Sequence, residues 1–155
     1  MKLIKLTQGK FARVDNSDFN RVNQFKWCAN KYKNTYYAVR VVGKQTIYMH
    51  RFIMETPDDK EVNHWDFNGL NCQRSNMMNC THQQNLWNQP PRGKSKYLGV
   101  SWFERDKKWT GRIRINGIAK NLGYFNTEIE AAIARDKAAI LYHKEFAKLN
   151  FIKNA

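Results

Sequence analysis

The dipeptide Asn116–Gly117 constrains the fold of this chain more than any other pair of residues. Asn-Gly between two strand-like runs is the strongest short signal for a two-residue hairpin, because both turn residues must adopt positive φ. We therefore expect antiparallel strands at residues 109–115 and 119–125. A third strand-like run, residues 98–103, precedes them and is separated from them by five charged residues. The pattern predicts a three-stranded antiparallel sheet.

A helix is expected directly after this sheet. Thr127 and Glu130 have the spacing of a capping box, in which each side chain accepts a hydrogen bond from the backbone N–H of the other residue. The helical pattern continues to about His143. Its isoleucines recur at helical spacing, so we expect them to face the sheet, while neighbouring alanines allow close packing. These isoleucines are Ile129, Ile133 and Ile140.

Six stretches of this segment share a pattern of glycines, aromatic residues and alanines. They read Tyr-Leu-Gly-Val-Ser-Trp (97–102), Trp-Thr-Gly-Arg-Ile-Arg (109–114), Asn-Leu-Gly-Tyr-Phe (121–125), Glu-Ala-Ala (130–132), Asp-Lys-Ala-Ala (136–139) and Leu-Asn-Phe (149–151). Together they resemble the ethylene-response-factor, or Apetala-two-type, DNA-binding domain. The resemblance implies a sheet that lies in the major groove of double-stranded DNA.

The side chains that would contact DNA follow from strand alternation. Ile113 and Ile115 point toward the helix, which leaves Arg112 and Arg114 pointing toward DNA. Arginine is the side chain best suited to guanine edges, whereas Lys and Trp mostly meet the backbone. For one further candidate, Trp109, the alternative is a hydrophobic cap on the sheet. The further candidates are Trp102, Arg105, Trp109 and Lys120.

A second motif occupies residues 62–88. Asn63 and His64 are followed twelve residues later by Asn76 and nine residues beyond that by Asn85. Between them lies Asn-Gly-Leu-Asn (68–71), which predicts a turn followed by a helix-compatible run. The order and spacing resemble the ββα-metal, or HNH, nuclease motif in its phage homing-endonuclease form. That form has Asp-His, then Asn, then Asn or His.

The resemblance implies a role for each motif residue. His64 is the general base, since a neutral imidazole accepts a proton near physiological pH, and the amide of Asn76 orients its ring. Position 63 and Asn85 bind one Mg²⁺ or a similar divalent cation such as Mn²⁺. A single-ion site normally cuts one strand per visit.

Asn63 departs from this pattern because it stands where the family has Asp. An amide oxygen is neutral and binds a hard cation less tightly than a carboxylate does, so we expect impaired cleavage. Three interpretations stay open: a naturally weakened nuclease, an amide that still binds the ion weakly, or a deliberate replacement of Asp.

Charge and composition identify the class of partner. The chain has 155 residues and a net charge of +14, which favours polyanions. Residues 1–91 contain thirteen basic and seven acidic groups, and residues 92–155 contain fourteen and six. No apolar run is long enough to span a bilayer and no signal-peptide core is present, so we expect a cytoplasmic protein of a bacterial cell or phage-infected host that binds no membrane. No obligate protein partner is evident.

The cysteines, His82 and His50 carry weaker signals. Three cysteines at unpaired spacing argue against a disulfide framework. Cys80 with His82 supplies too few ligands for a structural zinc site, which remains the lesser alternative. His50 lies near the catalytic site, contacts DNA, or is a hydrogen-bonded structural residue.

The domain organisation follows from the two motifs. The α+β chain should have an HNH nuclease domain with a β-rich N-terminal scaffold at 1–89, a basic linker at 90–96, and the Apetala-two-type domain at 97–155. In the scaffold, strands are expected at 35–42 and 45–49. Basic side chains around the motif and in the linker are predicted phosphate contacts, although His82 is equally compatible with a structural role. These residues are Arg74, His82, Arg92, Lys94 and Lys96.

Two functions from different classes are compatible with this sequence. The first is a metal-dependent DNA endonuclease that nicks one strand at a site chosen by the C-terminal sheet. The second is a non-catalytic, sequence-specific DNA-binding protein with a degenerate HNH fold. RNA binding through the same basic sheet is a third possibility.

Overall fold

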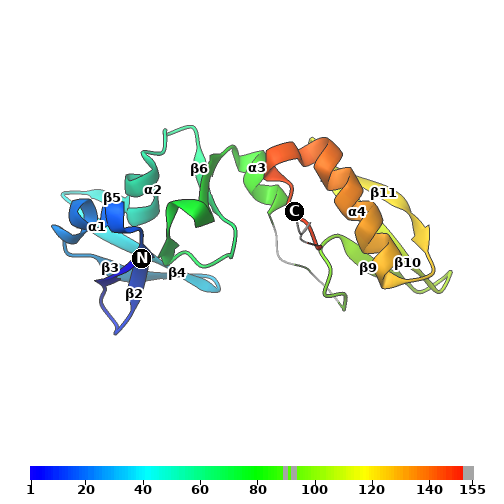
Figure 1. Cartoon of the computed structure of the whole chain (residues 1–155), viewed down its shortest axis with the longest axis horizontal. Helices are drawn as coiled ribbons and strands as arrows, with labels where there is room; N and C mark the ends of the chain where they lie inside the picture. The colour runs from blue at the N-terminus through cyan, green and yellow to red at the C-terminus, as the bar shows by residue number, and fades with distance from the viewer. Residues whose placement is uncertain (89–90, 92–93, 152–155) are drawn as a thin grey trace. The chain divides into compact units, whose positions relative to one another are not determined.

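The computed structural model describes residues 1–88, 91 and 94–151. The chain divides into two compact units, Met1–His82 and Gln83–Ala155 (Figure 1). Each unit combines small sheets with helices, so the predicted α+β class is confirmed. Among the described residues, no helix is both long and apolar enough to cross a membrane.

The first unit begins with a hairpin that joins a sheet assembled from distant parts of the chain. Strands β1 (Lys2–Lys5) and β2 (Phe11–Val14) are antiparallel, and β7 (Asn71–Cys72) pairs parallel to β2. Helix α1 (Asn16–Asn23) follows β2 and buries Val22. Because β7 belongs to the second motif, this pairing ties the motif to the N-terminus.

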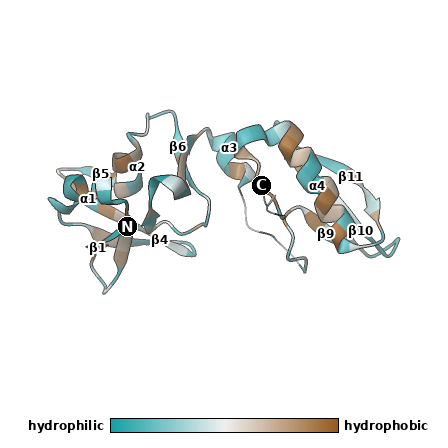
Figure 2. Cartoon of the chain, viewed as in Figure 1, coloured by the Kyte–Doolittle hydropathy of each residue, from teal (hydrophilic) through white to brown (hydrophobic). Residues whose placement is uncertain are grey.

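A three-stranded antiparallel meander forms the rest of the scaffold. Its strands are β3 (Cys28–Tyr32), β4 (Thr35–Val42) and β5 (Gln45–Tyr48), in that order. The chain then turns directly into helix α2 (Met49–Met54). This helix is mostly brown in Figure 2, and its Met49 and Ile53 are fully buried in the core.

The second motif folds as a hairpin-like pair of strands. Strand β6 (Glu61–His64) pairs antiparallel with β8 (Met77–Cys80), and the 3₁₀ turn η1 (Arg74–Asn76) precedes β8. The short helix α3 (His82–Trp87) follows. The helix-compatible run expected after residue 71 is therefore wrong: only one 3₁₀ turn forms, because the next residues pair with β6 and bury Met77.

In the second unit, the predicted sheet is confirmed. Strands β9 (Val100–Phe103), β10 (Lys108–Ile115) and β11 (Ile118–Phe125) form an antiparallel sheet of order β11-β10-β9. The turn residues Asn116 and Gly117 have φ of 49° and 80°, as the hairpin signal predicts.

Helix α4 (Glu128–His143) is also confirmed, with the reciprocal hydrogen bonds of a capping box between Thr127 and Glu130. The 3₁₀ turn η2 (Lys144–Phe146) ends it. The predicted packing face is wrong, because the alanine side of α4 meets the sheet. The helix lies so close that a Cβ on Gly111 would come within 2.9 Å of the Ala131 carbonyl oxygen. The exposed isoleucines are Ile129, Ile133 and Ile140.

Candidate functional site

His64 ends strand β6 and lies in a cluster of aromatic rings. Its side chain is 7% exposed, and its ring centroid lies 5.2 Å from that of His50 and 6.0 Å from that of Tyr37. Burial lowers the pKa of His64 to about 4, although the nearby Asp66 carboxylate acts in the opposite direction. The imidazole is therefore neutral at physiological pH, which is the form a general base needs.

The loop that follows His64 is held by the amide of Asn76. Asp66 N donates to Asn76 Oδ1 (3.1 Å), and Asn76 Nδ2 donates to Asp66 Oδ1 and to the Asn71 carbonyl (both 2.9 Å). The Asn76 carbonyl accepts from Trp65 N at 3.0 Å. Asn76 thus fixes the loop attached to His64, and its direct orientation of the imidazole stays a prediction.

Asp66 is a site residue that the sequence motif did not single out. Its carboxylate accepts from Asn68 N (2.9 Å), Asn71 Nδ2 (2.8 Å) and Asn76 Nδ2. Burial raises its pKa, but these hydrogen bonds and the charge of His64 outweigh burial and hold the pKa below its ordinary value. The signal in the sequence was an acidic residue two positions after the histidine.

The donor atoms near His64 determine which metal chemistry fits. Asn63 is 2% exposed and lies opposite Met78 in the β6–β8 pair. Nowhere in the described parts of the chain do three or more His, Cys, Asp or Glu side chains gather as a metal site. Amide oxygens are compatible with Mg²⁺ only when other oxygens supply the charge, and phosphates of the substrate commonly do so. Asn85 lies on α3, in the part assigned to the second unit.

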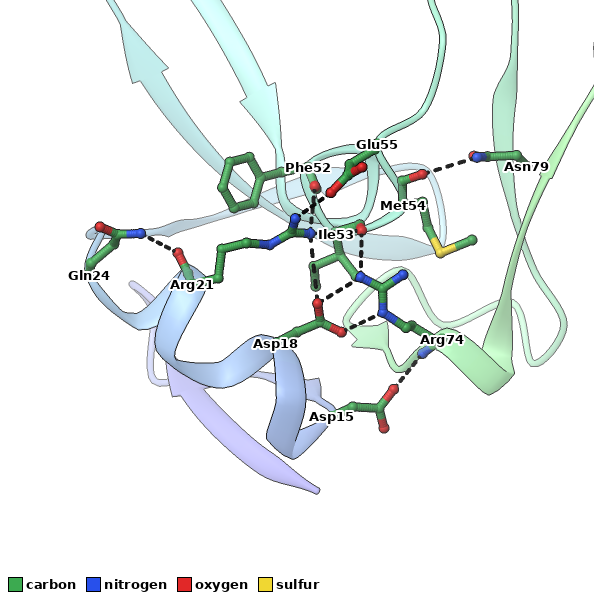
Figure 3. Close-up of polar contacts among 10 residues, drawn as sticks. All are labelled: Asp15, Asp18, Arg21, Gln24, Phe52, Ile53, Met54, Glu55, Arg74 and Asn79. Atoms are coloured by element: carbon green, nitrogen blue, oxygen red, sulfur yellow. Dashed lines mark hydrogen bonds and ion pairs between the residues drawn. The ribbon is translucent and has the colours of Figure 1, made fainter.

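Arg74 is engaged in an internal network, which Figure 3 shows. Its Nε and Nη2 each donate to the Asp18 carboxylate at 2.8 Å, and Nη2 also donates to the Ile53 carbonyl at 3.0 Å. Arg21 donates to the Phe52 and Ile53 carbonyls of the same helix end. Two guanidinium groups thus satisfy the C-terminal carbonyls of α2. Arg74 therefore has a structural role in this network, and its phosphate contact stays a prediction.

His82 and Cys80 lie at the end of the β6–β8 pair. His82 Nδ1 is 2.7 Å from Glu61 Oε1, and the His82 side chain is exposed. Burial raises the pKa of the Cys80 thiol to about 11. In the absence of a metal ion the thiol is therefore protonated.

The sheet of the second unit presents a basic and aromatic face away from α4. Arg112 and Arg114 are exposed on it, as the alternation predicted. Phe103 and Tyr124 contact each other at a centroid distance of 5.2 Å, and the Arg105 guanidinium lies 5.2 Å from the Phe103 ring. The Arg105 side chain is also paired with its neighbour Asp106. This face therefore brings together three of the predicted DNA contacts.

The remaining candidates on this sheet lie on the opposite side. Trp109 packs in the cluster beneath α4, and its cross-strand partner Trp102 contacts its ring at 5.2 Å. Lys120 pairs with Ile113, whose side chain faces α4, and its Nζ lies 6.0 Å from the Tyr142 ring. The hydrophobic-cap alternative therefore describes Trp109 correctly, and Lys120 does not share the face of the arginines.

The linker candidates are only partly described. Arg92 lies outside the described residues, as do three other positions of the segment 89–93. Lys94 is exposed, and Lys96 Nζ lies 5.2 Å from the Tyr97 ring. These two cations are accessible to a phosphate backbone.

His50 lies beside His64, with the two ring centroids 5.2 Å apart. Its ring is buried among the rings of His64, Tyr37 and Tyr48. Burial, followed by the charges of His64 and Arg51, lowers its pKa to about 3. No sequence motif pointed to Tyr37, which reaches this cluster from β4.

The chain is similar to a protein of Acanthamoeba polyphaga mimivirus that is named an uncharacterized HNH endonuclease. The two are 30% identical over 151 residues, which cover 94% of this chain and 77% of the relative. No family model matches the sequence.

Proposed function

Because this chain belongs to the HNH endonuclease family, we propose that it is a metal-dependent DNA endonuclease that nicks one strand. The observation that carries the proposal is the neutral imidazole of His64, placed at the end of β6 and followed by a loop that Asn76 clamps. A residue held in this way is suited to take a proton from the attacking water.

In this proposal, β6, β8 and α3 follow one another in the order of a ββα-metal unit. Asn63 would help to hold a divalent ion such as Mg²⁺ or Mn²⁺, whose chemistry is to neutralise charge on the phosphate and leaving oxygen, and Asn85 stays a predicted ligand. With a neutral amide at position 63, most of the anionic ligands must come from DNA. The site should therefore bind metal weakly by itself and cut slowly.

The second unit would bind double-stranded DNA as an Apetala-two-type domain. Arg112 and Arg114 share an exposed face with Arg105, and this combination suits contacts to guanine edges and phosphates. Lys94 and Lys96 add cations that would strengthen binding without reading sequence.

Restoring the carboxylate tests the enzymatic part of the proposal. The Asn63→Asp protein, incubated with Mg²⁺ and a supercoiled plasmid library that contains selected binding sites, should produce nicked circles. The same protein with His64→Ala should produce none. A restored protein that binds these plasmids and leaves them intact would refute the nuclease function.

The second candidate is a non-catalytic DNA-binding protein, and the neutral amide at position 63 favours it. It predicts tight, salt-dependent binding with no nicking in either the Asn63 or the Asn63→Asp form. The plasmid assay and a binding titration on the same DNA therefore separate the two functions.

A further inference from the structure

The β3–β4–β5 sheet has two chemically different faces. One packs on the core through Ala29, Ala38 and Ile47. On the opposite face, the strand register places Tyr32 beside Thr35, and it places Tyr48 beside Val39, which shares the Tyr37 face. Three tyrosines, Tyr32, Tyr37 and Tyr48, therefore occupy one face, and we call them the tyrosine row.

The rings of the row are contiguous. Centroids lie 6.3 Å apart between Tyr32 and Tyr37, and 6.2 Å apart between Tyr37 and Tyr48. Tyr32 at the outer end is 56% exposed, and Tyr37 in the middle of the row lies 6.0 Å from the His64 ring. The row thus leads from solvent to the candidate general base.

The loop after His64 rests directly on this row. A Cβ on Gly69 would come within 2.5 Å of the Tyr37 ring, and Gly69 N donates to the Thr35 hydroxyl at 3.0 Å. The loop and the row are therefore one surface, and a ligand at His64 would extend onto the tyrosines.

The charge around the row suits a polyanion. Residues 28–50 contain four basic residues and no acidic one. Lys33 and Lys44 are exposed at the hairpin turns, Lys31 is exposed within β3, and Lys33 Nζ lies 5.3 Å from the Tyr32 ring. Burial, followed by the two neighbouring tyrosines, raises the pKa of Tyr37. Its hydroxyl therefore stays neutral.

Aromatic rings beside cations are the usual means of binding single-stranded nucleic acid, because each ring stacks on a base and the cations follow the backbone. Bases within a closed duplex are stacked on each other and do not present their faces. We propose that the tyrosine row binds unpaired nucleotides of the DNA strand being cut, next to the phosphate at His64. The preferred substrate is then a duplex that is open at the cleavage site. This inference rests on the proposed nuclease function.

The test measures binding, so it does not depend on cleavage. Full-length protein with His64→Ala is titrated, without metal, with two fluorescent duplexes of the same sequence, one fully paired and one with a short central mismatch bubble. Stacking of one base is worth about tenfold in affinity, so the bubble should bind about tenfold more tightly. Tyr32→Ala should remove most of this preference, and Tyr32→Phe should keep it because the ring remains.

The matched control is Tyr142→Ala, which removes a 44% exposed tyrosine from helix α4. It should leave the preference for the bubble unchanged. Photocrosslinking of iododeoxyuridine placed in the bubble should label Tyr32 or Tyr37.

Several results would overturn the inference. Equal affinity of the His64→Ala protein for the two duplexes would do so, as would an equal loss on both duplexes in Tyr32→Ala. Stronger competition by single-stranded RNA than by single-stranded DNA would assign the row to RNA. Failure of the Asn63→Asp plasmid assay would refute the nuclease function but would leave the bubble preference and its crosslinks standing.

Discussion

Replacing Arg74 with Ala tests whether this side chain stabilises the fold or contacts DNA. The substitution removes two hydrogen bonds to Asp18, whose side chain is 5% exposed, and one to the Ile53 carbonyl. Loss of one partner from a fully buried ion pair costs about 3–5 kcal/mol. The Arg74 side chain is 49% exposed and Arg21 remains 3.7 Å from Asp18, so solvent and the second cation reduce the expected loss to about 2 kcal/mol.

A change of this size is measurable in the first unit alone. The indole N–H of Trp27, which donates to the Val22 carbonyl at 2.8 Å within the core, reports unfolding of this unit in NMR spectra during a urea titration. A loss of about 2 kcal/mol corresponds to a fall of about 10 °C in Tm for a unit of this length. Asp18→Asn should destabilise the unit as well, and the double variant should lose less than the sum of the two.

The salt dependence of DNA affinity tests the alternative role of Arg74 as a phosphate contact. A phosphate contact contributes about one unit to the slope of log affinity against log salt concentration. If Arg74→Ala lowers that slope and leaves the stability of the first unit unchanged, the structural assignment of Arg74 is refuted. Lys44→Ala, at an exposed turn, is the surface control for stability.

Three further predictions concern the site and the basic sheet. The pKa values of His50 and His64 are lowered to about 3 and about 4, so unfolding takes up protons below pH 6.5. The free energy of unfolding should therefore fall as the pH decreases from 6.5 toward these values. His50→Phe should reduce this pH dependence, measured by urea unfolding. Asn76→Ala, introduced into the Asn63→Asp protein, should slow plasmid nicking at least about tenfold with unchanged DNA affinity, because the loop after His64 loses its hydrogen bonds to Asn76. An unchanged nicking rate would contradict this role of Asn76. Arg112→Ala should weaken duplex binding by about 1–3 kcal/mol in a fluorescence titration, whereas Lys120→Ala on the α4 side should have a smaller effect; the reverse order would show that the other face binds DNA.

Local signals predicted the elements that depend on neighbouring residues. The Asn116–Gly117 turn and the Thr127–Glu130 capping box each require only a few adjacent side chains, so the sequence contained all the information. Strand β4 (Thr35–Val42) coincides with its predicted range for the same reason.

Features set by distant contacts were not predictable in this way. Arg74 has the sequence appearance of a phosphate contact, but its partner Asp18 lies 56 residues earlier. Tyr37 reaches His64 only because the loop containing Gly69 packs on β4. In each case a tertiary contact determined the role of a side chain whose local sequence was ambiguous.

The packing face of α4 shows where prediction from hydrophobic periodicity fails. Isoleucines exceed alanines in hydrophobicity, so a periodicity argument directs them to the core. The glycine at position 111 permits the backbone of the helix to approach the sheet, and only small side chains fit in the remaining space. Close approach therefore selected Ala131, Ala132 and Ala139 for the interface and left the isoleucines exposed.

The amide at position 63 links the stability of the site to its activity. Asn63 is 2% exposed, and a carboxylate buried to that extent is costly unless a cation or several hydrogen bonds compensate for it. Asp66, three residues later, already places one ionised carboxylate within the electrostatic range of His64. A second carboxylate at position 63 would depend on the metal ion, whereas the amide is tolerated without it. The neutral side chain therefore stabilises the metal-free site. Under the proposed function, slow cleavage and a stable DNA-bound protein would be two consequences of this one amide.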